Sequence, residues 1–294
     1  MEFDETERAG RTRQLEWWSK QFFGLTIAEI TATVVSKARD VCAAETFTRG
    51  KPQLNKKTGE IKAPKQFKRS GATVNRYIAT LSHVLSFAVK ERRLIDRNPV
   101  SDIKRKKESR GRTRFLDDDE RTALLDACAQ SDWAPLHTLV LLAITTGARR
   151  GELISLQWAD VDMKAGRALV KDTKNGEPRT LPLAGKALEA MRALKLNSSS
   201  HSEYLFPNPT GHPGTFENFD SHWYAALEAA GISNFRFHDL RHTTASMLAA
   251  QGCSLLEIAD VLGHKTLAMV KRYSHLVVDH KAKVIERMIA TKGL

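Results

Sequence analysis

The chain has 294 residues, of which 41% are hydrophobic and 27% are charged. This composition excludes a disordered or collagen-like chain and fits a folded protein of about two domains. Three widely spaced cysteines, Cys42, Cys128 and Cys253, argue against a disulfide framework and against a zinc site. The acidic amino terminus lacks the features of a signal peptide, and no apolar stretch is long enough to span a bilayer. We therefore expect a cytoplasmic protein.

The positive charge is concentrated in the first part of the chain. The formal net charge is +12. Residues 1–114 contain 26 Lys and Arg against 13 Asp and Glu, whereas residues 115–294 contain 20 against 21. Because neutralised phosphates release counterions, such a basic region predicts binding of a polyanion such as DNA. A basic surface that only promotes solubility is the alternative.

The first part of the chain is predicted to be helical. Apolar residues recur at helical spacing around Trp18, over residues 30–44 and over residues 74–88. Between the last two segments, residues 47–71 are rich in Gly, Pro, Lys and Arg, so we expect a mobile basic loop. Half of the residues from Ser101 to Arg114 are cationic, which places a domain boundary there. This segment is either a flexible charged linker or a strap across a phosphate backbone.

The second part opens with four consecutive acidic residues, Asp117 to Glu120. Their density resembles a metal site, but no partner carboxylates follow at ligand spacing. Asp117 followed three residues later by Glu120 fits a capping box at the start of a helix, which we favour. No metal ion or other cofactor is therefore predicted.

A buried helix is predicted over residues 136–144, ending at Thr146-Gly147. In the helix that follows, Arg149 and Glu152 are three residues apart and share one face. Short strand-like runs then begin near residues 161, 168 and 180, and Asn175-Gly176 favours a hairpin turn. These runs predict a small antiparallel sheet with Lys174 beside the tip of a hairpin.

The carboxy-terminal region combines a tyrosine with histidines and arginines. His238 and Arg241 are three residues apart on a predicted helix, so both can point the same way. A later helix is expected to end at Gly263, with His264 just beyond it. Tyr273 is expected two turns into a further helix. A phenol, with a pKa of ~10, needs a proton acceptor and nearby positive charge to attack phosphorus.

These segments resemble the tyrosine recombinases of the phage-integrase family. The matching motifs are Thr146-Gly147-Ala148-Arg149-Arg150-Gly151-Glu152-Leu153, Lys174, His238-Asp239-Leu240-Arg241-His242-Thr243, Leu262-Gly263-His264 and Arg272-Tyr273. They occur in the family's order. The pattern Thr-Gly-x-Arg-x-x-Glu selects Arg149 as the phosphate ligand and leaves Arg150 as a surface residue.

The resemblance implies a mainly α (α+β) fold. A helical, SAM-like core-binding domain that binds DNA is expected over residues 1–103, and a basic interdomain linker over residues 104–114. Residues 115–294 are expected to form a mixed catalytic domain with a small three-stranded antiparallel sheet. The implied partners are double-stranded DNA, three further copies of the chain in a tetramer on DNA, and an accessory DNA-bending protein. No association with a membrane is expected.

The resemblance also implies that six residues carry the reaction: Arg149, Lys174, His238, Arg241, His264 and Tyr273. Tyr273 is the implied nucleophile, giving a 3′-phosphotyrosyl link and a free 5′-hydroxyl. The two arginines and His264 are implied to contact the phosphate. Lys174 is the implied acid for the leaving oxygen, and His238 is implied to serve the proton of the tyrosine.

The implied reaction is site-specific integration or excision of a phage or mobile element, without metal or ATP. Glu152 is expected to orient Arg149 or His238, whereas His242 and His275 receive no firm role. Two alternatives remain open. A type IB topoisomerase uses the same chemistry to relax DNA, and a DNA-binding regulator keeps the fold without catalysis.

Overall fold

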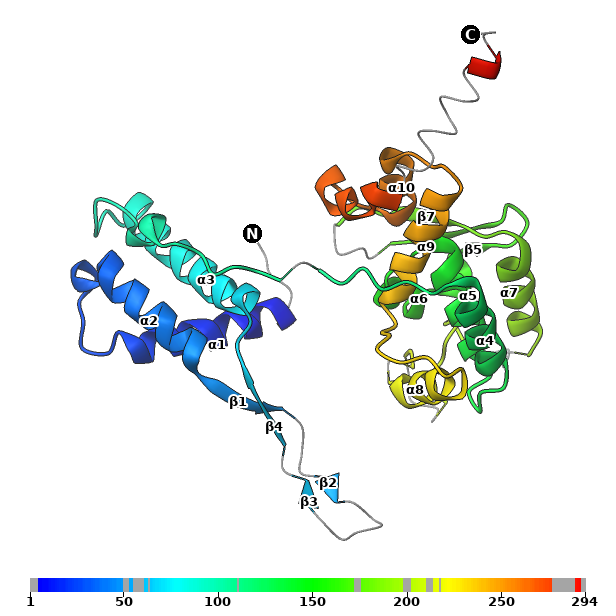
Figure 1. Cartoon of the computed structure of the whole chain (residues 1–294), viewed down its shortest axis with the longest axis horizontal. Helices are drawn as coiled ribbons and strands as arrows, with labels where there is room; N and C mark the ends of the chain where they lie inside the picture. Colours follow the sequence, from blue (N-terminus) through cyan, green and yellow to red (C-terminus); the bar gives the residue numbers. More distant parts are fainter. Residues whose placement is uncertain are drawn as a thin grey trace. The chain divides into compact units, whose positions relative to one another are not determined.

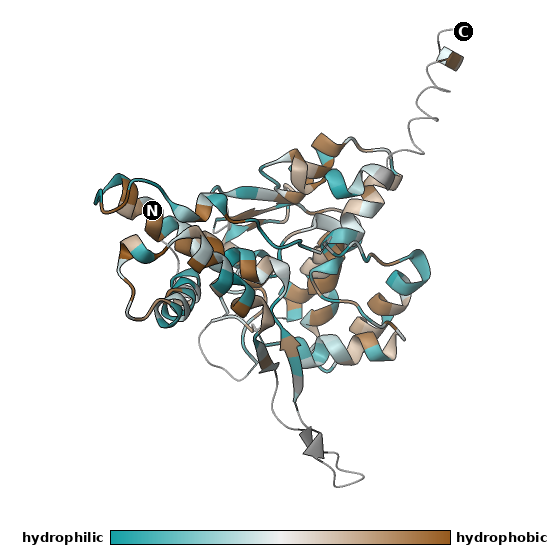
Figure 2. Ribbon diagram, turned by 60° about the vertical axis from the view of Figure 1, so that its left-hand side comes forward, coloured by the Kyte–Doolittle hydropathy of each residue, from teal (hydrophilic) through white to brown (hydrophobic). Residues whose placement is uncertain are grey.

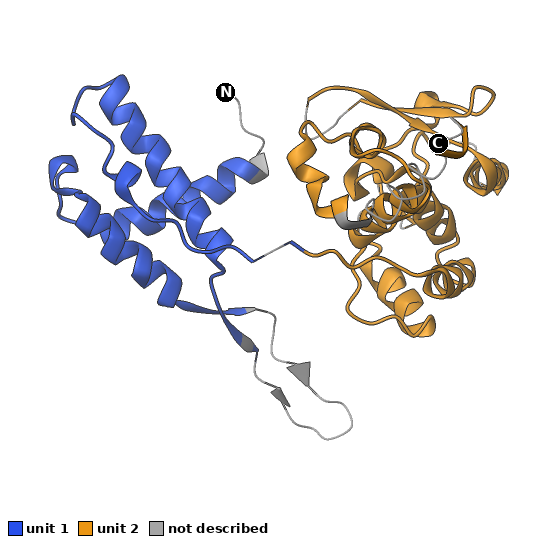
Figure 3. Ribbon diagram, turned by 45° about the horizontal axis from the view of Figure 1, so that its top comes forward, with its two compact units in different colours: residues 1–111 blue, residues 112–294 orange. Residues whose placement is uncertain are grey.

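The computed structural model describes residues 5–49, 53–54, 61–62, 64–109, 111–171, 176–197, 202–209, 214–216, 218–276 and 289–291. The chain divides into two compact units, residues 1–111 and residues 112–294 (Figure 3). The described part is mainly helical with small antiparallel sheets, which confirms the predicted fold class (Figure 1). None of its helices is both long and apolar enough to cross a membrane.

The described residues of the first unit form three α-helices and two short 3-10 helices. They are α1 (Glu5–Gln21), η1 (Ile27–Glu29), α2 (Ala32–Ala44), α3 (Gly71–Lys90) and η2 (Pro99–Asp102). Helices α1 and α2 both pack against α3. Trp18 from α1, Val35 from α2 and Ile78 from α3 are almost fully buried in one hydrophobic cluster, as their helical spacing predicts.

The expectation of an irregular loop over residues 47–71 is wrong for the described residues of this segment. Strand β1 (Thr46–Arg49) pairs antiparallel with β4 (Lys65–Lys68), and β2 (Gln53–Leu54) pairs with β3 (Ile61–Lys62). Phe47 lies opposite Phe67, with ring centroids 6.2 Å apart. Alternating β-branched, aromatic and long polar side chains suit a two-stranded ribbon, and this cross-strand aromatic pair supports it.

The basic segment 104–114 makes defined contacts inside each unit. In the first unit, the Asn75 side chain accepts a hydrogen bond from the Lys106 amide at 2.8 Å and donates to the Lys106 carbonyl at 2.9 Å. In the second unit, Arg112 Nη2 donates to Asp239 Oδ2 at 2.8 Å, and Arg114 pairs with Glu120. Lys106, Arg112 and Arg114 of this charged segment are therefore each held by a specific partner within their own unit.

In the second unit the structure describes a further set of named helices. They are α4 (Asp118–Ala129), α5 (Pro135–Thr146), α6 (Arg150–Ile154), η3 (Trp158–Asp160), α7 (Gly185–Asn197), α8 (Asp220–Ala229), α9 (Asp239–Ala250), α10 (Leu255–Leu262), η4 (Leu267–Met269) and η5 (Lys271–Leu276). Asp117 and Glu120 form a reciprocal capping box at the start of α4, which confirms the preferred reading of the acidic cluster.

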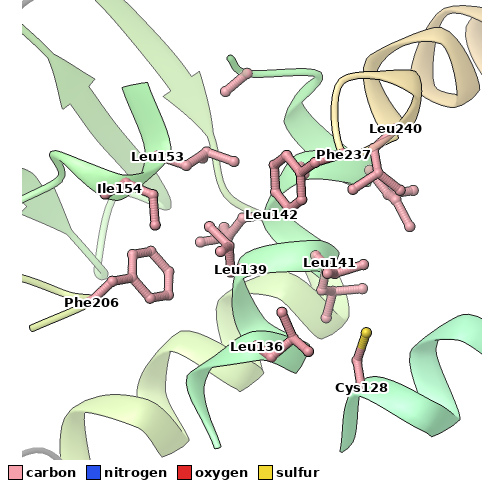
Figure 4. Close-up of a cluster of buried hydrophobic side chains, with 14 of the residues drawn as sticks. Cys128, Leu136, Leu139, Leu141, Leu142, Leu153, Ile154, Phe206, Phe237 and Leu240 are labelled. Carbon is pink, nitrogen blue, oxygen red and sulfur yellow. The ribbon is translucent and has the colours of Figure 1, made fainter. Parts of the chain in front are cut away.

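Helix α5 occupies the centre of this unit and packs against α4, α7 and α9. Leu136, Leu139 and Leu142 on α5 are fully buried, together with Leu153 and Phe206 from neighbouring segments (Figure 4). Figure 2 shows hydrophobic and hydrophilic residues on the same helical ribbons, as in amphipathic helices around a core. The buried core holds the elements that carry the site.

The predicted three-stranded sheet is present, with strands in the order β5 (Val161–Asp162), β6 (Arg167–Val170) and β7 (Arg179–Pro182). All three strands are antiparallel. Ala168 and Val170 on β6 are buried, whereas Arg167 and Leu169, which alternate with them along the strand, are exposed, so one face of the sheet covers the core.

Candidate active site

A pocket of about 390 Å³ lies where the carboxy-terminal helices meet the start of α9. Its lining residues are mostly cationic, imidazole or hydroxyl groups: Arg112, Arg236, His238, Asp239, Arg241, His242, His264, Met269, Arg272 and Tyr273. Four of the six residues expected to carry the reaction are thus gathered in one pocket. Such a lining favours an anionic ligand over an apolar one.

Tyr273 is almost fully buried against α9 and α10, within a small apolar cluster that includes Ala245, Leu262 and Val270. The prediction that Tyr273 lies two turns into a regular helix is wrong. Tyr273 lies in the 3-10 helix η5, and its amide donates to the Val270 carbonyl at 2.8 Å. Short 3-10 turns let the chain tuck both Val270 and Tyr273 inward. Burial raises the pKa of Tyr273, so the hydroxyl keeps its proton at neutral pH.

The tyrosine hydroxyl contacts His242 rather than His238. Tyr273 Oη and His242 Nδ1 are hydrogen-bonded. Burial and the neighbouring His238 lower the pKa of His242 to about 4, so the imidazole is neutral at pH 7. A neutral imidazole has one nitrogen without a proton, so Nδ1 can accept a hydrogen bond from the phenol when the ring proton is on Nε2.

Arg241 lies on α9 with only 4% of its surface exposed. Its Nη1 donates to the Gly147 carbonyl at 2.7 Å. Within the described residues its Nη2 has no hydrogen-bond partner, although the atom is buried. Burial and the charges of Arg149 and Arg179 lower the pKa of Arg241 to about 10, and it stays protonated at neutral pH. A charged donor of this kind is costly unless it binds an anion.

His264 directly follows α10, as predicted. The Gly263 amide bonds to the Asp260 carbonyl at 2.9 Å and the His264 amide to the Ala259 carbonyl at 2.8 Å, which is a Schellman motif. His264 Nδ1 is buried without a partner in the described part of the chain. Burial, with the charge of Arg241, lowers the pKa of His264 to about 4. The turn thus presents a neutral imidazole to the pocket.

Arg149 is the N-cap residue of α6, and Glu152 on that helix holds it. Arg149 Nη1 donates to Glu152 Oε1 at 2.6 Å, and the Arg149 amide donates to Oε2 at 2.9 Å. Burial favours a higher pKa for Glu152, but these hydrogen bonds and the charge of Arg179 outweigh it and leave the pKa below its usual value. Glu152 therefore carries a negative charge that orients Arg149.

His238 is exposed, at the start of α9 and at the edge of the pocket. Its ring centroid lies 5.8 Å from that of His242. Helix α9 begins at Asp239 with His238 as its N-cap residue, whereas the sequence placed His238 on the helix itself. Phe235 and Phe237, just before it, are buried in the core. Lys174 lies outside the described residues.

Two residues of this region make contacts that were not predicted from the sequence. Arg179, the first residue of β7, donates from Nη2 to Glu152 Oε2 at 2.8 Å. No motif pointed to it, because its partners are distant in sequence. His242 was visible beside Arg241 in the sequence, and its spacing of one residue gave no sign that it contacts Tyr273.

The lowered pKa of His242 predicts that the folded protein loses stability in acid. The folded pKa of His242 is about 4, against about 6.5 in the unfolded chain, so the unfolded state binds the extra proton first. The neutral imidazole of His242 stabilises the folded state fully above pH 6.5, and this contribution is lost as the pH falls towards 4. We expect His242 to lower the free energy of unfolding by up to about 3 kcal/mol over this range. Urea unfolding at pH 7.5 and pH 4.5 measures it.

The control is His242→Asn, which keeps a polar group near the Tyr273 hydroxyl but does not titrate. The loss of unfolding free energy between the two pH values should be smaller in this variant. An equal loss in variant and wild type would contradict the assignment.

Gly147 links the end of α5 to the site, and its backbone predicts a strict need for glycine. Its φ is +61°, and a Cβ would overlap Leu262 Cδ2 and lie 3.2 Å from Thr244 Cγ2. Gly147→Ala should destabilise the protein by about 1–3 kcal/mol through strain and overpacking. Gly151→Ala is the matched control, since nothing lies within 4 Å of its Cβ position. Thermal unfolding of both variants checks the difference.

Comparison with known proteins agrees with the fold and the motifs. Residues 114–280 match the model of the phage integrase family. The integrase of Salmonella phage P22 is 30% identical over 291 residues, covering 91% of this chain and 71% of the relative. The shufflon-specific DNA recombinase of Escherichia coli is 31% identical over 249 residues, covering 84% of this chain and 58% of the relative.

Solved structures share the same fold at lower sequence identity. The integrase of transposon Tn1549, in complex with a circular intermediate DNA, has a TM-score of 0.73 at 16% identity and covers 97% of this chain and 94% of that chain. A lambda integrase tetramer bound to a Holliday junction has a TM-score of 0.65 at 21% identity and covers 90% of this chain and 73% of that chain. The protein thus belongs to the phage integrase family of tyrosine recombinases.

Proposed function

We propose that this protein is a site-specific DNA recombinase that cuts and rejoins strands through a covalent 3′-phosphotyrosyl intermediate. The observation that carries the proposal is the pocket that brings Tyr273, Arg241 and His264 together. Two buried nitrogens of this pocket, Arg241 Nη2 and His264 Nδ1, have no hydrogen-bond partner among the described residues. Phosphate oxygens are the acceptors that a guanidinium and an imidazole bind best in such a setting.

In the proposed reaction Tyr273 Oη attacks the scissile phosphorus. A new P–O bond to the tyrosine forms, and the P–O bond to the 5′ oxygen breaks. The phenolic proton passes to His242, which contacts the hydroxyl, and not directly to the exposed His238. Arg241 and Arg149 neutralise the nonbridging oxygens, where charge develops in the transition state. We propose His264 as a further hydrogen-bond partner of the phosphate.

The leaving 5′ oxygen must take up a proton, and we assign its delivery to Lys174 from the family motif. Because the energy of the broken ester bond is kept in the phosphotyrosine, the free 5′-hydroxyl of a second strand can reverse the step. We expect no requirement for a divalent metal or for ATP. The basic first unit is proposed to hold the duplex, and exchange of two duplexes requires four copies of the chain.

The test is covalent capture of DNA. The full-length protein is incubated with a library of nicked duplexes carrying a randomised core, in EDTA and without nucleotide, and then denatured in SDS. We expect a protein–DNA adduct that survives SDS and disappears with protease. Failure to form an adduct with any duplex of the library would contradict the proposal.

The alternative function, a type IB topoisomerase, predicts a different result with plasmid DNA. A type IB topoisomerase relaxes any supercoiled plasmid catalytically, whereas a site-specific recombinase needs its captured core sequence. Comparing relaxation of plasmids with and without the selected core separates the two. Relaxation that does not depend on the core would favour the topoisomerase.

A further inference from the structure

The side chain of Arg179 on β7 hydrogen-bonds to two other segments of the site, α6 and the end of α10. Its Nη2 donates to Glu152 Oε2 at 2.8 Å, and its Nη1 donates to the Val261 carbonyl at 3.0 Å. The side chain is only 15% exposed. A guanidinium fits this task because its donors diverge in a fixed plane, which a lysine ammonium cannot reproduce.

The first contact fixes the carboxylate that orients Arg149. Glu152 Oε2 is shared between the Arg149 amide and Arg179 Nη2, while Oε1 accepts from Arg149 Nη1. The Glu152 side chain is 3% exposed, so solvent offers little replacement for a lost partner. Without Arg179, one oxygen of this buried carboxylate would lose its charged partner, and its rotation would displace Arg149.

The second contact fixes the turn that presents His264. The amides of Gly263 and His264 already bond to Asp260 and Ala259 in the Schellman motif, and Arg179 takes up the Val261 carbonyl beside them. Gly263 has a φ of +64°, and a Cβ there would lie 2.8 Å from Arg179 Nη1. The guanidinium therefore packs directly on the backbone that precedes His264.

We propose that Arg179 is a positioning residue, which joins the Arg149–Glu152 pair to the Gly263–His264 turn. It acts beside the 3.4 Å hydrogen bond from Arg149 Nη2 to the Gly263 carbonyl and so helps to set the distance between two phosphate-binding side chains. This inference rests on the proposed function. Arg179 acts through Glu152 and the Val261 carbonyl, since both its terminal nitrogens are occupied by these partners. A displacement of about 1 Å at such a site lowers the rate of the chemical step by about 10²-fold.

The main experiment compares Arg179→Gln and Arg179→Lys with a control on the same sheet. Arg167→Gln on β6 removes the same charge from an exposed residue whose Asp162 contact is 3.8 Å long. With the captured nicked duplex, we expect Arg179→Gln to slow single-turnover cleavage by about 10²-fold with little change in the Kd for DNA. Arg179→Lys should recover part of the rate, and Arg167→Gln should cleave like the wild type.

A double-mutant cycle with Glu152→Gln tests whether Arg179 acts through the carboxylate. If it does, the double variant should lose little more rate than the more impaired single variant. Independent, multiplied losses would overturn the proposed route. A rise in Kd that accounts for the whole loss would instead make Arg179 a direct DNA ligand through its Nε, which is buried without a partner among the described residues.

A measurement without DNA keeps the inference separate from the proposed function. NMR of the histidine ring protons, with the His264 signals assigned from His264→Asn, should show the His264 resonances shifted in Arg179→Gln and unchanged in Arg167→Gln. Unchanged His264 resonances in Arg179→Gln would overturn the inference. If the wild type captures no duplex, the proposed function fails, while the resonances still decide whether Arg179 positions the turn.

Discussion

Replacing Arg241 by glutamine should reduce the rate of covalent DNA capture by about 10³-fold or more, the loss expected when an arginine that neutralises a transferring phosphoryl group is removed. Arg241 is buried, stays protonated at neutral pH and has an unpartnered Nη2 in the described pocket. Glutamine keeps a polar side chain near the Gly147 carbonyl but carries no charge. The measurement is single-turnover cleavage of the captured duplex, quantified on denaturing gels.

Arg150→Gln is the matched control for this prediction. Arg150 is the neighbouring arginine of the Arg149 motif, yet it pairs with Asp220 at 2.8 Å and lies over the Phe219 ring, 4.3 Å from its centroid. Its loss should leave the cleavage rate close to that of the wild type. Equal losses in Arg241→Gln and Arg150→Gln would contradict the assignment of the phosphate ligand.

Replacing Tyr273 by phenylalanine should abolish the covalent adduct, with a loss of at least about 10³-fold. The substitution removes only the hydroxyl that contacts His242 and leaves the ring in the cluster of α9 and α10. The fold and the affinity for the duplex should therefore be retained. SDS-resistant adduct formation and the Kd for the same duplex measure the two properties.

Tyr224→Phe serves as the control, because Tyr224 lies on α8 with 59% of its surface exposed. This variant should form the adduct at the wild-type rate. An adduct formed by Tyr273→Phe at a comparable rate would show that another residue is the nucleophile.

The sequence predicted the parts of the site that are encoded by local spacing. Capping residues fix the start of α4, and the glycine after α10 fixes the place of His264. Such signals depend on backbone groups within a few residues, so they can be recognised without knowing the fold. The hydrophobic spacing of α3 and α5 is also local in sequence and could be recognised in the same way.

The remaining features depend on contacts between distant segments. Arg179 is 27 residues from Glu152 and 82 residues from Val261, so no spacing rule could assign its role. The short 3-10 helix that carries Tyr273 is set by burial of Val270 and Tyr273 against α10, where tertiary packing overrides helical periodicity. The β1–β4 ribbon was missed because its lysines and nearby glycines and prolines obscured a short alternating pattern.

Mass spectrometry of the captured adduct is the most direct test of whether Tyr273 becomes linked to DNA. After digestion with protease and nuclease, we expect a peptide containing Tyr273 joined to the 3′-phosphate of a nucleotide, and a free 5′-hydroxyl on the other strand end. A nucleotide attached to a different residue, or a link through a 5′-phosphate, would contradict it.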